Sequence, residues 1–122
     1  MNLNIVEESL QIEFTLKEQF LAVRLKKLWE IPLSHIQKVT TIAPQTTWKE
    51  LRSPGTALPG LVRAGTYYSQ RGKEFWLVNY RKNNYLTIEL QNENYKRIVM
   101  TVDNNEFWQQ RLVERIGNEH GA

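Results

Sequence analysis

The sequence predicts a mainly β fold with one C-terminal α-helix, and three observations support this. Apolar and polar residues alternate over most of the chain up to residue 102, as they do in half-buried strands. Short turn-forming segments separate the alternating stretches in the second half. The period changes once, after Asp103, to that of a helix. We therefore expect a sandwich or barrel of two antiparallel sheets, with seven strands, capped by the helix.

The first three expected strands precede residue 43. Their apolar positions are Leu10, Ile12 and Phe14, then Leu21, Val23 and Leu25, then the β-branched run 36–42. In the second of these strands, Arg24 and Lys26 occupy the alternate positions and point outward. These three strands are expected to form one layer of the fold.

Residues 63–102 predict a four-stranded antiparallel meander. Its strands are the aromatic segments around Tyr67–Tyr68 and Phe75–Tyr80, followed by Leu86, Ile88 and Leu90, and then by Ile98, Met100 and Val102. Segments 70–73, 82–84 and 92–94 have the composition of tight turns, so each strand is expected to pair with the next.

The terminal helix is predicted from its start signal and its apolar stripe. Asp103 and Glu106 form a D-x-x-E variant of the capping box. The expected buried stripe consists of Trp108, Leu112 and Ile116, widened by Phe107 and Val113. Gly117 is expected to end the helix, because glycine commonly follows a helical C-terminus.

A long connection links the two halves between residues 44 and 62. Loops of this length in a compact domain are usually functional or disordered, and this one contains the turn dipeptides Pro54-Gly55 and Pro59-Gly60. One interpretation is a folded-back flap that covers an end of the barrel with Trp48, Leu58 and Leu61 beneath it. The other is a binding surface, whose candidate residues are Trp48, Lys49, Arg52, Gly55, Gly60 and Arg63.

The order of elements, the I-P-L-S-H-I segment at 31–36 and the pattern R-x-P-G-T…P-G…G-T-Y resemble bacterial pleckstrin-homology (PH)-like proteins. In this chain the pattern consists of Arg52, Pro54, Gly55, Thr56, Pro59, Gly60, Gly65, Thr66 and Tyr67. The resemblance covers about residues 8–116. It implies a single PH-like domain over 1–122, with a tail at 117–122, and a tendency to form oligomers.

Enzymatic chemistry is not expected from this composition. The chain has no cysteine, which excludes disulfides and thiolate catalysis, and only two histidines, His35 and His120. Neither histidine has a neighbouring acid and nucleophile in sequence, and no metal-ligand spacing is present. We expect no catalytic residue, no metal and no cofactor.

Binding is the expected function, and two kinds of partner stay open. Protein interaction or self-association through exposed sheet edges is the preferred interpretation. The alternative is an anionic lipid surface, contacted by Lys17, Arg24 and Lys26, which form a K-x6-R-x-K pattern across the expected first hairpin. The net charge of +3 is too small to favour nucleic acid. No apolar run could span a bilayer, so we expect a cytoplasmic protein, peripheral to the membrane at most.

Overall fold

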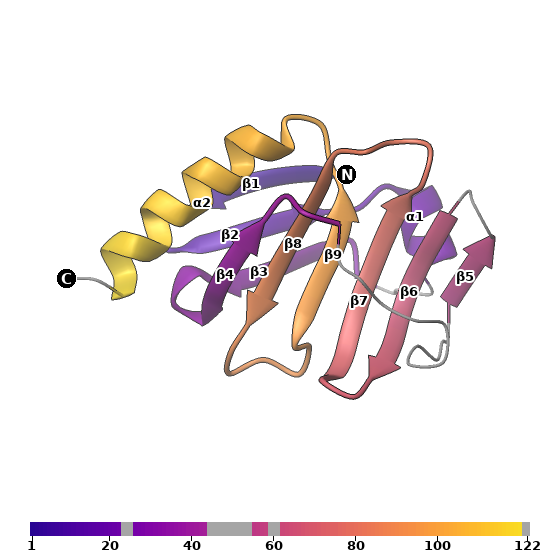
Figure 1. Cartoon of the computed structure of the whole chain (residues 1–122), viewed down its shortest axis with the longest axis horizontal. Helices are drawn as coiled ribbons and strands as arrows, with labels where there is room; N and C mark the ends of the chain where they lie inside the picture. Colours follow the sequence, from indigo (N-terminus) through magenta and orange to yellow (C-terminus); the bar gives the residue numbers. More distant parts are fainter. Residues whose placement is uncertain (23–25, 44–54, 59–61, 121–122) are drawn as a thin grey trace.

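The computed structural model describes residues 1–22, 26–43, 55–58 and 62–120 (Figure 1). The first elements are β1 (Asn2–Val6), β2 (Ser9–Glu13), α1 (Leu16–Leu21), β3 (Leu28–Pro32), the 3-10 turn η1 (Leu33–His35) and β4 (Ile36–Thr40). The remaining ones are β5 (Gly55–Leu58), β6 (Val62–Ser69), β7 (Gly72–Asn79), β8 (Tyr85–Leu90), β9 (Arg97–Thr101) and α2 (Asn105–His120). The described residues thus form nine strands, whereas the sequence pattern predicted seven.

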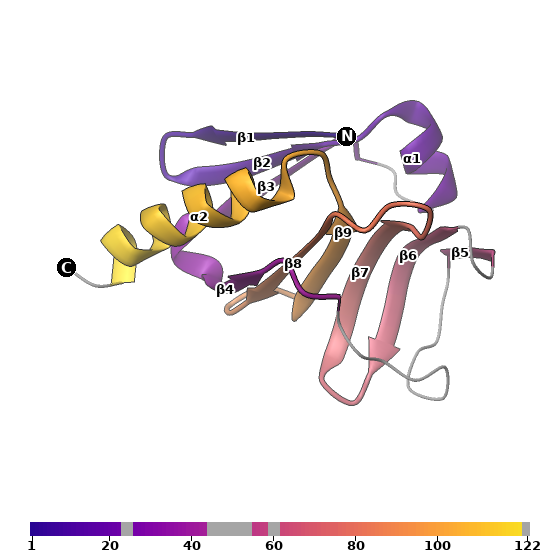
Figure 2. The ribbon, with the colours of Figure 1, turned by 45° about the horizontal axis from the view of Figure 1, so that its top comes forward.

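Two separate sheets make up most of the structure, as Figures 1 and 2 show. The smaller is antiparallel, in the order β1-β2-β3, and the larger has six strands in the order β4-β8-β9-β7-β6-β5. The mainly β architecture with a C-terminal helix is therefore confirmed. Within the described ranges no strand of one sheet pairs with a strand of the other, so the sheets do not close into a barrel.

The predicted meander is wrong in the order of its strands. β9 lies between β7 and β8, antiparallel to β8 and parallel to β7. The connection after β7 therefore passes the end of β9, where the Val102 N–H donates to the Asn84 carbonyl at 3.0 Å. The turns at 70–73 and 92–94 each join two strands that pair with each other, whereas the connection at 82–84 does not. The parallel register sets Glu74 opposite Arg97, two buried residues that form an ion pair.

The strand expected at residues 21–25 is also wrong at its start, because residues 16–21 form α1. A capping box begins this helix: the Thr15 hydroxyl accepts from the Glu18 N–H at 3.2 Å, and the Glu18 carboxylate accepts from the Thr15 N–H at 2.8 Å. This local start signal outweighs the alternation that Leu21 begins. Residues 23–25 lie outside the described part of the chain.

The main core fills the space between the two sheets. The alternation predicted for β2 is confirmed, because Leu10 and Ile12, together with Phe14 just beyond the strand, are 0–1% exposed. Phe75 of β7 meets Phe14 and Trp29 edge to face, with ring centroids 5.6 and 5.4 Å apart. These contacts bind the inner faces of the two sheets to each other.

The C-terminal helix packs against β4, β8 and η1. Leu112 is fully buried and Ile116 is 9% exposed, as the stripe predicted, but Phe107 and Val113 are 58% and 42% exposed and do not widen it. The helix also continues through Gly117 to His120. An added Cβ at Gly117 would meet nothing within 4 Å, so this glycine is an exposed helix residue rather than a terminator.

Candidate functional site

Most of the predicted partner-binding residues lie outside the described part of the chain. These are Trp48, Lys49, Arg52 and Gly60, together with Arg24 of the expected lipid-contact set. Gly55 begins the edge strand β5 and pairs with Gly65 of β6. Arg63 is buried on β6, whereas Lys17 and Lys26 are exposed elsewhere on the surface. The predicted candidates that are described therefore do not form one site.

Arg63 packs against a second hydrophobic cluster on the larger sheet, formed by Tyr67, Trp76, Val78 and Val99 with Tyr80 and Tyr85 against it. Trp76 and Val78 of β7 lie in this cluster, while the alternate residue Leu77 lies in the main core, so the cluster occupies the face away from the smaller sheet. The Arg63 guanidinium carbon lies 5.0 Å from the Trp76 ring centroid and 5.3 Å from that of Tyr67. Arg63 is 4% exposed and packs against aromatic rings inside its own domain.

Two tyrosines of this cluster have shifted acidities. Burial raises the pKa of the Tyr67 phenol, and the charge of Arg63 offsets part of that rise. Burial likewise raises the pKa of Tyr80, again with partial compensation by Arg63. Both phenols are therefore neutral in the folded protein at physiological pH and contribute packing rather than charge.

Glu74, fully buried on the same face of β7, is the centre of a polar network. Its carboxylate accepts from an Arg97 guanidinium nitrogen at 2.8 Å, from the Trp76 indole N–H at 3.0 Å and from the Ser69 hydroxyl at 2.8 Å. A buried carboxylate needs such compensation to remain charged. The network joins β6, β7 and β9 and therefore has a structural role.

In contrast to this buried network, the short helix α1 lies at the surface, and none of its residues is buried. Leu16 and Phe20 are each 84% exposed and lie one turn apart on the same helix face. Lys17 is exposed beside them, and the exposed Lys26 and Lys27 follow on the chain before β3. Leu16 and Lys27 line one shallow cavity, which brings the two segments side by side. We call Leu16, Lys17, Phe20, Lys26 and Lys27 the α1 surface.

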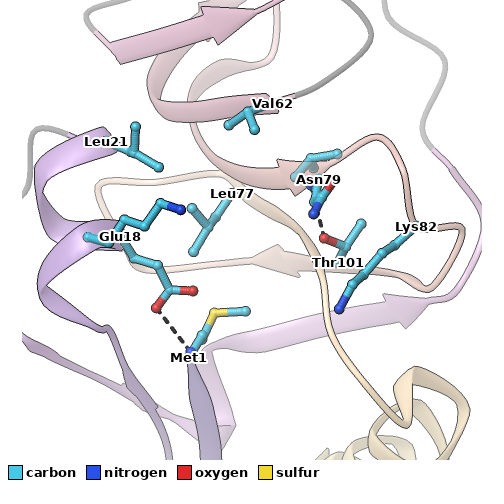
Figure 3. A pocket seen from close by; sticks show the side chains of 10 residues that line it. Met1, Glu18, Leu21, Val62, Leu77, Asn79, Lys82 and Thr101 are labelled. Atoms are coloured by element: carbon cyan, nitrogen blue, oxygen red, sulfur yellow. Dashed lines mark hydrogen bonds and ion pairs between the residues drawn. The ribbon is translucent and has the colours of Figure 1, made fainter.

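A pocket of about 240 Å³ lies between α1 and the larger sheet (Figure 3). Leu21 of α1, Val62 of β6 and Leu77 of β7 supply apolar lining. Of its charged groups, Glu18 pairs with the Met1 amino group at 3.0 Å, and the Lys82 amino group lies 3.6 Å from the Asp103 carboxylate, while Lys17 also lines the pocket. The pocket therefore combines an apolar lining with charged groups at its rim, and no single class of ligand follows from it.

Contrary to the prediction from the sequence, Asp103 does not cap the N-terminus of α2. The helix α2 begins at Asn105, two residues later, and the Trp108 N–H donates to the Asn104 carbonyl at 3.1 Å. The Asp103 carboxylate instead contacts Lys82 and accepts from the Asn84 side-chain amide at 3.4 Å. It thereby ties the β7–β8 connection to the segment before α2.

Metal binding and membrane crossing each require a particular feature of the described ranges. No group of three or more histidine, aspartate or glutamate side chains there is placed to hold a metal ion. None of the helices in those ranges is long and apolar enough to cross a bilayer.

Comparison with known proteins gave no match: no family model, no curated protein and no solved structure is significantly similar to this chain. The PH-like resemblance accordingly stays a prediction.

Sequence reasoning missed Leu16, Phe20 and Lys27 as site candidates. A signal was present, because Thr15 to Glu18 reads T-L-K-E, a capping box, and Leu16 and Phe20 are spaced as i and i+4. An apolar pair at this spacing is normally assigned to a core-facing stripe, and only the structure shows that it faces outward.

Proposed function

We propose that this chain is a non-catalytic binding module that contacts anionic lipid head groups peripherally through the α1 surface. The supporting observation is the combination of two large, 84% exposed apolar side chains, Leu16 and Phe20, with three exposed lysines. Exposed apolar side chains grouped at one place commonly mark an interaction site. Basic residues near exposed apolar side chains complement a membrane surface, where acyl chains lie beneath anionic head groups.

The expected affinity is modest. Fully burying a leucine or phenylalanine side chain is worth about 1.5–3 kcal/mol, and each lysine near an anionic leaflet contributes about 1 kcal/mol. Immobilising the protein on the surface offsets part of this gain. Binding should therefore be reversible, should require anionic lipid, and should weaken as salt screens Lys17, Lys26 and Lys27.

Flotation with vesicles tests the proposal. The chain should float with vesicles of phosphatidylcholine mixed with phosphatidylglycerol at low salt, and not with pure phosphatidylcholine vesicles. Replacing both apolar residues, Leu16→Ser with Phe20→Ser, should reduce the bound fraction about tenfold through the lost apolar burial. Phe107→Ser is the matched control, because Phe107 is 58% exposed but lies on α2, and it should bind as the parent chain does.

Equal flotation with neutral vesicles, or unchanged binding of the double variant, would contradict the proposal. An absence of flotation under every condition would also reject it. The exposed α1 surface would then be assigned to a protein partner, the interpretation that the sequence favoured.

A further inference from the structure

The strand β3 has one edge with which no strand of the described residues pairs, and the hydrogen-bonding groups of this free edge can be identified. The Phe14 N–H donates to the Lys27 carbonyl and the Leu33 N–H donates to the Glu8 carbonyl, both at 2.8 Å. In an antiparallel ladder, residues alternate between facing the partner strand and facing away from it. The register between β2 and β3 then directs the peptide groups of Leu28 and Glu30 away from β2. Within the described part of the chain, no strand pairs with this edge.

Pro32 fits the same alternation. It occupies an outward position at the end of β3, where a missing N–H removes no bond to β2. The free edge therefore offers two complete peptide groups, at Leu28 and Glu30, and stops at Pro32. An extended segment that pairs here would be short.

A groove of about 450 Å³ runs beside this edge. The residues that line it are Lys26, Leu28, Trp29, Glu30, Glu93, Asn94 and Tyr95. One wall is thus the edge of β3, and the other is the turn that joins β8 to β9. Trp29 and Tyr95 give the groove an aromatic lining, with ring centroids 5.0 Å apart.

Contacts with β6 and β7 hold Tyr95 of the aromatic lining in position. The Tyr95 hydroxyl exchanges a hydrogen bond of 2.8 Å with the Thr66 hydroxyl, and the Lys73 amino group lies 4.6 Å from the Tyr95 ring centroid. Glu93 is likewise engaged, by the His35 imidazole. The groove therefore has fixed walls and does not have to be built on binding.

We propose that this groove binds an extended peptide segment of a partner protein, which adds to β3 as a fourth strand. Such strand addition derives affinity from main-chain hydrogen bonds and specificity from alternate side chains. Partner residues opposite Leu28 and Glu30 would exchange backbone hydrogen bonds with them. The partner residue opposite Trp29 would direct its side chain toward Trp29 and Tyr95, so an apolar or aromatic residue is expected there.

The charge of Glu30 favours a particular kind of residue in the partner segment. The exposed Glu30 carboxylate lies on the outer face of β3, so a basic residue is favoured at the partner position directly opposite it. A second copy of this chain fits less well than an isolated segment. The edge of a second folded sheet would bring its neighbouring strand against the turn at 93–95, which forms the far wall of the groove.

The probe is the fluorescein-labelled peptide acetyl-Val-Lys-Phe-Thr-Val-amide. In antiparallel addition it sets Lys opposite Glu30, Phe opposite Trp29 and Thr opposite Leu28. Fluorescence anisotropy should show saturable binding to the whole chain. Amide NMR signals of Leu28 and Glu30 should shift on binding, and their hydrogen exchange should slow.

A matched pair of variants isolates the backbone contact. Leu28→Pro removes the outward N–H without removing a bond to β2, while Leu28→Ala keeps that N–H. Binding should weaken about tenfold in Leu28→Pro relative to Leu28→Ala, because a backbone hydrogen bond is lost. The same peptide with an N-methyl group on its Thr should weaken to a similar degree against the parent chain. The experiment with the N-methylated peptide tests the backbone contact even if Leu28→Pro does not fold.

Three outcomes would overturn the proposal: no saturable binding of the peptide, binding that N-methylation leaves unchanged, or NMR shifts confined to residues away from β3 and the 93–95 turn. Because the proposal does not depend on α1, the double variant Leu16→Ser with Phe20→Ser should bind the peptide normally.

Discussion

Two regions of this molecule invert the usual distribution of polarity in opposite directions. The larger sheet buries charge, with Glu74 fully enclosed and Arg97 only 7% exposed. Helix α1 exposes apolar surface, with Leu16 and Phe20 each 84% accessible. The buried charges satisfy each other at 2.8 Å, so they fix how strands pair. The exposed apolar side chains have no such partner among the described residues, so their explanation has to come from outside the fold.

The largest expected effect is on the buried pair. Glu74→Ala should lower the free energy of unfolding by about 3–5 kcal/mol, because it leaves the Arg97 charge buried without its carboxylate. Arg71→Ala is the matched control: Arg71 contacts the same carboxylate at 3.4 Å, but its side chain is half exposed. It should change stability by about 0–1 kcal/mol. Denaturant unfolding measures both, and equal effects would reject the structural role assigned to the pair.

The Glu74–Arg97 pair also shows which part of the fold could not be predicted from the sequence. The faces of β2 and β8 and the buried positions of α2 follow from local periodicity, and these were predicted correctly at Leu10, Leu86 and Leu112. The position of β9 beside β7 depends on a contact between residues 74 and 97. No local pattern encodes which strands become neighbours, so the predicted meander is wrong in its strand order.

The candidate site was predictable to a smaller degree. The pattern across an expected hairpin predicts Lys17 and Lys26 as lipid contacts, and both are exposed, but Lys17 lies on a helix. The sequence contained the capping box at Thr15, yet the alternation of Leu21, Val23 and Leu25 competed with it. The groove beside β3 was not predictable, because its walls come from segments more than sixty residues apart, as Trp29 and Tyr95 show.

An intermediate effect on the unfolding free energy is expected from two tyrosines of the second cluster at alkaline pH. Tyr67 and Tyr80 have folded pKa values raised above their ordinary value of 10.0, so the folded state holds its phenolic protons more tightly than the unfolded chain does. Their contribution to stability is complete below pH 10 and is lost as pH rises through the folded pKa. The unfolding free energy should therefore fall with pH above about 10.

The variant Tyr67→Phe separates this effect from general alkaline denaturation. It removes one of the two phenols while keeping the ring that faces Trp76, so the fall in stability above pH 10 should become shallower. An identical slope in the parent chain and in Tyr67→Phe would contradict the assignment.

The smallest expected effect is at the start of α1. Thr15→Ala removes the hydroxyl that accepts from the Glu18 N–H, and loss of such a cap costs about 1 kcal/mol. Because α1 buries no residue, this cost should appear as local fraying and not as a shift in global unfolding. Exchange of the Ala22 amide, which donates to the Glu18 carbonyl at 2.9 Å, should accelerate about fivefold, whereas Thr15→Ser should retain the parent rate. Unchanged exchange in Thr15→Ala would show that the cap does not hold α1, and that the positions of Leu16 and Phe20 depend instead on how the helix meets β6.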